Sequence, residues 1–106
     1  MRILFDQGTP APLRQALSGH QVITAFELGW STLKNGELLA AAEQERFELF
    51  VTTDRNLRYQ QNLATRRIAI LVLSTTSWPR IRAAVDQVIA VANSCKPGAF
   101  IELPIP

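Results

Sequence analysis

The chain has 106 residues, the length of one domain with a single hydrophobic core, and its 11 lysines and arginines against 9 aspartates and glutamates give a net charge of only +2. That balance is too weak by itself to indicate nucleic-acid binding, and no apolar run approaches the about 20 residues of a membrane span. No secretory signal precedes the first apolar segment, and Cys95, the single cysteine, excludes an intrachain disulfide, so we expect a cytoplasmic protein.

The chain opens with a short apolar strand over residues 2–5. Thr9 before Pro10 is typical of a helix N-cap followed by proline at the first helical position, which predicts a helix over residues 10–17. A second strand is expected over residues 20–24.

A loop or short helix over residues 25–34 leads to a helix over 35–46 that opens with Asn-Gly-Glu. The third strand covers residues 48–53, and a helix is expected over 56–64. The uninterrupted apolar segment 68–73 is typical of a parallel strand that is buried on both faces.

Pro79 opens the longest helix, over residues 79–93, and the last strand covers 99–103. Strands that alternate with helices in this way indicate an α/β fold with a mainly parallel five-stranded sheet. No domain boundary interrupts the pattern, so we expect a single domain over residues 1–106.

Two of the expected strands run into an aspartate, since Asp6 follows the first strand and Asp54 follows the third. Ligands in such sheets bind beyond the carboxyl ends of the strands, where the strand order reverses. If the first and third strands are neighbours, about 5 Å separates their backbones and the two carboxylates face one crevice.

Two carboxylates that close repel each other, so a cation or a proton must compensate them. Oxygen ligands favour Mg²⁺ or Mn²⁺, and Glu37 is the best candidate for a third acid. The same side chains have structural alternatives. Asp54 can cap the following helix, Asp6 can form an Asx-turn, and Glu37 can stabilise the first turn of its own helix.

Several cations fall in or next to the segments that should border this crevice, with Tyr59 among them. They are Lys34, Arg55, Arg58, Arg66 and Arg67. A basic rim around an acidic metal site suits phosphodiester chemistry, because the rim holds backbone phosphates while the metal activates water. The alternative is a solvated helix face.

Four blocks of the sequence, in this order and spacing, resemble the small bacterial PIN-like proteins, a branch of the PIN-domain nuclease superfamily. The blocks are Ile3-Leu4-Phe5-Asp6-Gln7, Gly19-His20-Gln21-Val22, Asn35-Gly36-Glu37-Leu38-Leu39 and Val51-Thr52-Thr53-Asp54-Arg55-Asn56. The resemblance covers residues 1 to about 73 and implies a three-layer α/β/α fold.

Active PIN domains hold Mg²⁺ or Mn²⁺ for RNA cleavage, often as the toxin of a toxin–antitoxin pair, so the resemblance implies RNA and an antitoxin protein as partners. Carried over by position, Asp6, Glu37 and Asp54 are its catalytic and metal-binding acids. Many relatives have acids where this chain has three amides. These amides, expected to support the site, are Gln7, Asn35 and Asn56.

Three functions therefore remain open. The first is a metal-dependent endoribonuclease of PIN-like type. The second is a catalytically weak or inactive PIN-like module that binds RNA or a protein partner, which the three amides favour. The third is a phosphoacceptor domain like a response regulator. It ranks last, because such a domain needs a lysine at a late strand end and the fourth strand ends in Leu73-Ser74.

The tail, residues 99–106, is apolar to its end and places Ile101, Leu103 and Ile105 on one face. As an edge strand it leaves backbone groups unpaired, while its prolines block open-ended strand addition. PIN-like relatives commonly dimerise. We therefore expect a weak homodimer that buries part of this tail or the helix over 80–93.

Overall fold

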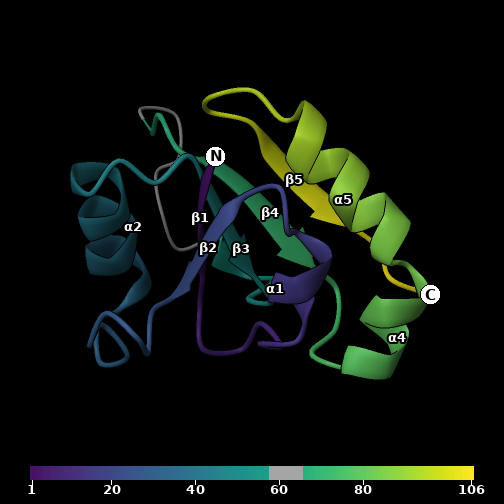
Figure 1. Cartoon of the computed structure of the whole chain (residues 1–106). Helices are drawn as coiled ribbons and strands as arrows, with labels where there is room; N and C mark the ends of the chain where they lie inside the picture. Colours follow the sequence, from purple (N-terminus) through teal and green to yellow (C-terminus); the bar gives the residue numbers. More distant parts are fainter. Residues whose placement is uncertain (58–65) are drawn as a thin grey trace.

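The computed structural model describes residues 1–57 and 66–106, which form a five-stranded, all-parallel sheet with helices on both faces (Figure 1). The strands are β1 (Arg2–Phe5), β2 (Gln21–Thr24), β3 (Leu49–Thr52), β4 (Ala69–Leu73) and β5 (Phe100–Leu103). Their order is β2-β1-β3-β4-β5. The predicted α/β architecture with a parallel five-stranded sheet is confirmed.

Helices cover the two faces of the sheet unequally. They are α1 (Leu13–Ala16), α2 (Asn35–Gln44), α4 (Trp78–Ala83) and α5 (Val85–Ser94). Figure 1 shows α2 on one side of the sheet and α1, α4 and α5 on the other, which gives three layers. Among the described helices, none has the length and apolar character that crossing a bilayer requires. The helix expected over 56–64 falls almost entirely outside the described residues.

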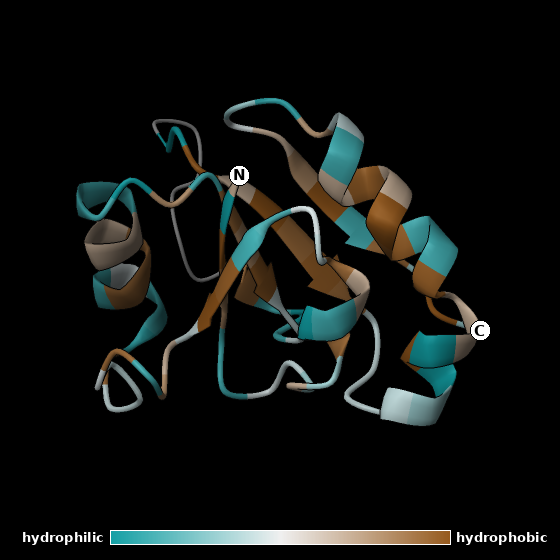
Figure 2. Cartoon of the chain, in the orientation of Figure 1, coloured by the Kyte–Doolittle hydropathy of each residue, from teal (hydrophilic) through white to brown (hydrophobic). Residues whose placement is uncertain are grey.

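The core consists of two hydrophobic clusters, because successive side chains of a strand point to opposite faces. Ile3, Phe5 and Val51 pack under α1, α4 and α5, whereas Leu4 and Phe50 pack under α2. Hydrophobic residues therefore run along most of β3 and β4 (Figure 2). This two-sided burial explains why these strands are apolar throughout rather than alternating.

The first predicted helix is shorter than expected and begins later, since α1 starts at Leu13 after a turn through Pro10 and Pro12. The expected N-cap at Thr9 is wrong. The Thr9 hydroxyl instead lies 2.6 Å from Asp6 Oδ1 and 2.9 Å from the carbonyl oxygen of Val51. Its side chain joins the β1 and β3 strand ends and does not serve a helix.

The predicted helix over 79–93 is interrupted at Ala84, whose φ of −110° and ψ of 18° leave the helical region. Ser77 caps the first part, α4, by accepting a hydrogen bond from the Arg80 amide at 3.4 Å. The Arg80 guanidinium then donates to the carbonyl oxygens of Ile105 and Pro106 at 3.0 and 2.9 Å. The break lets α4 hold the end of the chain while α5 covers the sheet.

The tail lies against its own chain. Ile105 is 4 % exposed and belongs to the core, and its amide donates to Ser74 Oγ at 2.7 Å. Of the aliphatic face expected for a dimer, Ile105 is therefore already buried. Ile101 and Leu103 on β5 are half-buried, so the homodimer stays a prediction that rests on this strand.

Candidate functional site

The strand order reverses at β1, because β2 lies on one side of it and β3 on the other, with Phe5 in register with Val51. The condition set for a shared crevice, that the first and third strands be neighbours, is met. Asp6 directly follows β1, and Asp54 follows β3 by two residues. The two aspartates thus lie at the carboxyl edge of the sheet, at the position where doubly wound sheets bind ligands.

Asp6 is held by three hydrogen-bond donors from two segments. Its Oδ1 accepts from the Thr9 amide at 3.0 Å and contacts the Thr9 hydroxyl at 2.6 Å, while its Oδ2 accepts from the Thr52 hydroxyl. The Thr9 amide lies three residues after Asp6, so this local turn is one residue longer than the expected Asx-turn, and the Thr52 contact spans the two strands. The carboxylate is fixed in orientation and keeps a lone pair free on Oδ2.

Asp54 is fixed in a similar way. Its Oδ1 accepts from the Asn56 amide at 3.0 Å, so the carboxylate forms the turn after β3 that was expected of a capping residue. Its Oδ2 accepts from the Asn35 side-chain Nδ2 at 2.7 Å. Asn35, the first residue of α2, is therefore brought to the carboxyl edge together with Asp54.

Thr52 links the two aspartates and was not recognised from the sequence. It is fully buried, its hydroxyl donates to Asp6 Oδ2, and it accepts the Asp54 amide at 3.1 Å. A signal was available, because a threonine at the end of an otherwise apolar strand places a hydroxyl where a site is expected. One buried side chain thus couples the positions of both carboxylates.

Glu37 lies on the first turn of α2, where it caps the helix. Its carboxylate accepts a hydrogen bond from the Lys34 amide at 3.3 Å, and the side chain is exposed. Within residues 1–57 and 66–106, no three His, Cys, Asp or Glu side chains gather in a way that could hold a metal ion. In this structure Glu37 stabilises the first turn of its own helix, which was the structural alternative to a role as metal ligand.

Two hollows flank the segment Asp6-Gln7-Gly8. The smaller, of about 150 Å³, is bordered by Gln7, Trp30 and Asn35. The larger, of about 730 Å³, is lined by Thr24, Arg14 and Phe26 among others. Phe26 is 75 % exposed, the most exposed large hydrophobic side chain among the described residues.

Arg14 brings a positive charge to the larger hollow. Its guanidinium pairs with Glu27, whose carboxylate also accepts from the Thr24 amide at 2.9 Å. The Thr24 amide and the Arg14 hydrogen bond lower the pKa of Glu27. The pair fixes the arginine at the rim of the hollow.

The expected basic rim is only partly at this edge. Lys34 precedes α2 and is exposed, and Arg55 is exposed beside Asp54. Arg58 lies outside the described residues. Arg66 and Arg67 precede β4 and therefore lie at the amino edge of this parallel sheet, opposite the aspartates.

The expectation that Arg66 and Arg67 border the crevice is therefore wrong in position. Arg66 Nη1 pairs with Glu43 Oε1 of α2 at 2.7 Å, and the Arg67 amide donates to the other oxygen at 2.7 Å. Partial burial raises the pKa of Glu43, but these hydrogen bonds outweigh it and leave that pKa lowered. The two arginines thus tie the start of β4 to α2.

Comparisons with protein-family models, curated proteins and solved structures found no match to this chain. The residues and geometry of the carboxyl edge therefore provide the basis for a proposed function.

Proposed function

We propose that this protein is a metal-dependent ribonuclease of PIN-like type, with Asp6 and Asp54 as the ligands of Mg²⁺ or Mn²⁺. The observation that carries the proposal is the pair of aspartates on adjacent strand ends at the order reversal, each oriented by hydrogen bonds from the chain. The sequence blocks that resemble PIN-like proteins include both residues.

The donor set fits a magnesium-type ion. Mg²⁺ is commonly bound through one or two carboxylates, with waters and substrate phosphates completing its shell, so a third acid is not required. Asp6 Oδ2 and both oxygens of Asp54 retain lone pairs after their hydrogen bonds to the chain. The threonine and asparagine donors hold the carboxylates as supporting groups around metal sites do.

A bound divalent ion would supply an activated water and stabilise the leaving oxygen of a phosphodiester. The chain itself would position the substrate. Phe26 presents an exposed ring on which an unpaired base can stack, and Arg14 borders the same hollow as Asp6. Single-stranded RNA is therefore the substrate that these side chains suit best.

A binding module with little or no catalysis is the second candidate, and Asn35 favours it. Its Nδ2 donates to Asp54 Oδ2, which an aspartate at this position could not do as a carboxylate. The contact occupies a lone pair that a metal would otherwise share, and it adds no charge to the site. Weak metal affinity is the expected consequence.

The strand order β2-β1-β3-β4-β5 is also that of response regulators, which favours the phosphoacceptor reading by fold alone. The residues disfavour it. Ser74 follows β4 and Pro104 follows β5, so neither late strand is followed by the lysine that such a domain needs.

Calorimetric titration with Mg²⁺ and Mn²⁺ tests the proposal, on the wild type, Asp6→Asn and Asp54→Asn. Asp86→Asn is the matched control, because Asp86 is an exposed aspartate in the first turn of α5. We expect millimolar or tighter binding by the wild type and the control, and a loss of about tenfold or more in either site variant.

Cleavage of a single-stranded RNA in the same buffers should follow metal binding. Absence of binding by the wild type to both ions at millimolar concentration would overturn the catalytic proposal. Intact RNA bound with a steep salt dependence would then favour the binding module. Equal metal binding by all four proteins would place the ion elsewhere.

A further inference from the structure

One feature that the proposed function does not use is a pocket of about 600 Å³ at the amino edge of the sheet, opposite Asp6 and Asp54. Its accessible apolar lining comes from Met1, Cys95 and Pro97, while Phe47, Ile68 and Ala69, which also border it, are buried. Pockets of this size, mostly apolar with a few converging polar groups, are typical small-molecule sites.

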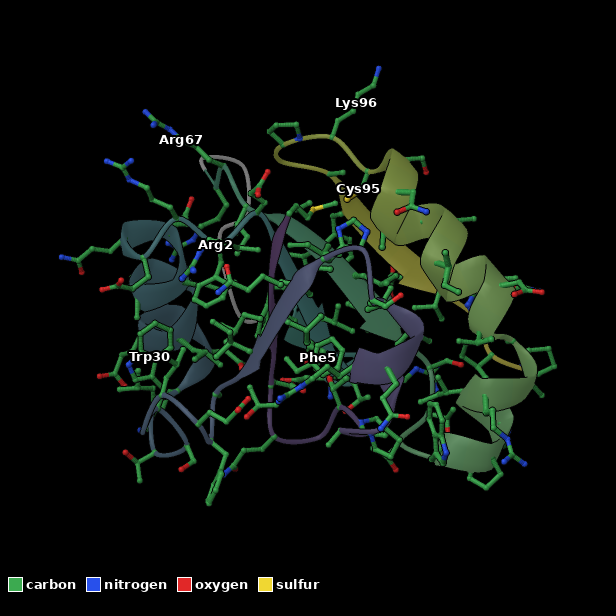
Figure 3. The ribbon with its side chains drawn as sticks, in the orientation of Figure 1. Arg2, Phe5, Trp30, Arg67, Cys95 and Lys96 are labelled. Carbon is green, nitrogen blue, oxygen red and sulfur yellow. The ribbon has the colours of Figure 1, made fainter. Side chains whose placement is uncertain are left out.

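Three cations from three separate segments line this pocket. Arg46 follows α2, Arg67 precedes β4 and Lys96 follows α5. Arg67 and Lys96 project outward from the same end of the molecule, and the Cys95 thiol lies further in (Figure 3). Among residues that the structure describes, the charged groups of these three side chains make no ion pair.

The acids of the pocket are already engaged. Glu43 accepts from the Arg66 guanidinium and the Arg67 amide, at 2.7 Å each. Glu48 accepts from the Arg2 amide at 3.0 Å. Glu43 is also paired with Arg66, whereas Glu48 makes no ion pair among the described residues and keeps its charge, so the three cations of the lining outnumber its one unpaired carboxylate.

The loop that carries Lys96 is held against the start of β4 by a tight turn. The Ala99 amide donates to the Lys96 carbonyl at 3.0 Å, with Pro97 and Gly98 as the central residues and a Gly98 φ of +78°. Proline followed by glycine at positive φ is typical of a type II turn. The Gly98 amide then donates to the Arg67 carbonyl at 2.8 Å, which places the two cationic segments side by side.

Arg46 occupies a position at which glycine is the usual residue. Its φ is +61°, and α2 ends in a Schellman motif, in which the Phe47 amide donates to Ala42 at 2.9 Å and the Arg46 amide to Glu43 at 3.0 Å. The left-handed conformation strains any residue with a Cβ. Retaining an arginine there lowers stability, and its side chain lines the pocket.

We propose that this pocket, which we call the amino-edge pocket, binds a nucleoside phosphate, with Arg46, Arg67 and Lys96 on the phosphate and the apolar part against the base. Arginine suits this ligand because its planar guanidinium donates two hydrogen bonds to one phosphate. The inference is independent of the metal site, since it uses neither aspartate. A free nucleotide and the phosphorylated end of an RNA share this chemistry.

Isothermal titration at low ionic strength with AMP, adenosine, inorganic phosphate and a short 5′-phosphorylated RNA tests the proposal. We expect AMP to bind at least about tenfold more tightly than adenosine or inorganic phosphate, because each of these lacks one half of the contacts. Tighter binding of AMP than of the phosphorylated RNA identifies a free nucleotide as the ligand, and the reverse identifies an RNA end.

Arg46→Gly separates binding from folding. The substitution removes a phosphate contact, so AMP affinity should fall about tenfold, the loss typical of one charge-assisted hydrogen bond. It also relieves the left-handed strain, so the urea midpoint should rise. A merely structural arginine would not give these opposite changes.

Lys96→Gln should weaken AMP binding similarly, whereas Arg82→Gln, which removes an exposed cation on α4, should leave it unchanged. The proposal fails if wild-type protein does not bind AMP or the phosphorylated RNA at millimolar concentration. It also fails if Arg46→Gly and Arg82→Gln bind AMP equally well.

Discussion

Replacing Thr52 by valine should destabilise the protein far more than the same change at Thr53. Thr52 is fully buried, donates to Asp6 Oδ2 and accepts the Asp54 amide at 3.1 Å. A hydrogen bond to a charged group contributes about 1.5–3 kcal/mol and a neutral one about 0.5–1.5 kcal/mol, so the loss of both should cost about 2–4.5 kcal/mol. Valine has nearly the same shape, so little of this cost reflects a cavity.

Urea denaturation followed by circular dichroism measures the effect, as a lower midpoint with an unchanged slope. Thr53→Val is the control, because Thr53 is half-buried and its change should stay within about 0.5 kcal/mol. If the two variants unfold at the same midpoint, the bridge between the strand ends contributes nothing and the reasoning is refuted.

The same variant bears on the proposed metal site. If Thr52 orients Asp6, then Thr52→Val should weaken Mg²⁺ binding by about 10–100-fold under conditions where the protein is still folded. Unchanged metal affinity in a destabilised Thr52→Val would show that the threonine stabilises the fold without supporting the site.

Four further outcomes are expected. Gly8→Ala should lower the urea midpoint, because a Cβ there would lie 2.4 Å from Thr53 Oγ1, and Thr53→Ala in the same chain should restore most of it. Glu43→Gln should make the melting temperature less dependent on pH in acid, as a pH series of thermal melts can show. Because the pKa of Glu43 is lowered in the folded protein, its carboxylate contributes stability that is full at neutral pH and disappears as the pH falls through the lowered pKa. Phe26→Ala should weaken binding of metal-free protein to single-stranded RNA by about tenfold, and Phe26→Trp should not, as judged by fluorescence anisotropy. Ile105→Ala should cost about 2–5 kcal/mol in urea without changing the molar mass in light scattering, because Ile105 is buried within its own chain.

The arrangement of the strands could be predicted because parallel sheets leave a clear pattern. Apolar runs separated by helices indicate the fold, and the rule that ligands bind at the carboxyl ends of strands predicts Asp6 and Asp54 at one edge of the sheet. The contacts of these residues could not be predicted. Thr52 and Asn35 approach them through register and helix placement, which depend on how the layers pack.

Two errors have identifiable physical causes. Arg66 and Arg67 were expected at the crevice, but they precede β4, and the start of a parallel strand lies at the amino edge of the sheet. The break at Ala84 follows no proline or glycine. The local sequence contains no signal for it, because the contact that it permits, between Arg80 and the tail, joins residues far apart in the chain.

The amino-edge pocket escaped the sequence analysis for a related reason. Its cations come from positions 46, 67 and 96, and no spacing rule connects them. The turn at Gly98, which aligns the segment of Lys96 with that of Arg67, depends on a contact between distant parts of the chain. Sites assembled from single residues of distant segments become visible only when the fold is known.

The central position of β1 has a consequence for biosynthesis. β1 is synthesised before both of its neighbours in the sheet, β2 and β3, and β3 ends at Thr52. One edge of β1, whose last three residues are buried, therefore stays unpaired until β3 has been translated, and parallel pairing is slow because each partner requires a long crossover. During that interval, the nascent chain exposes an apolar strand to which chaperones and other nascent chains can bind.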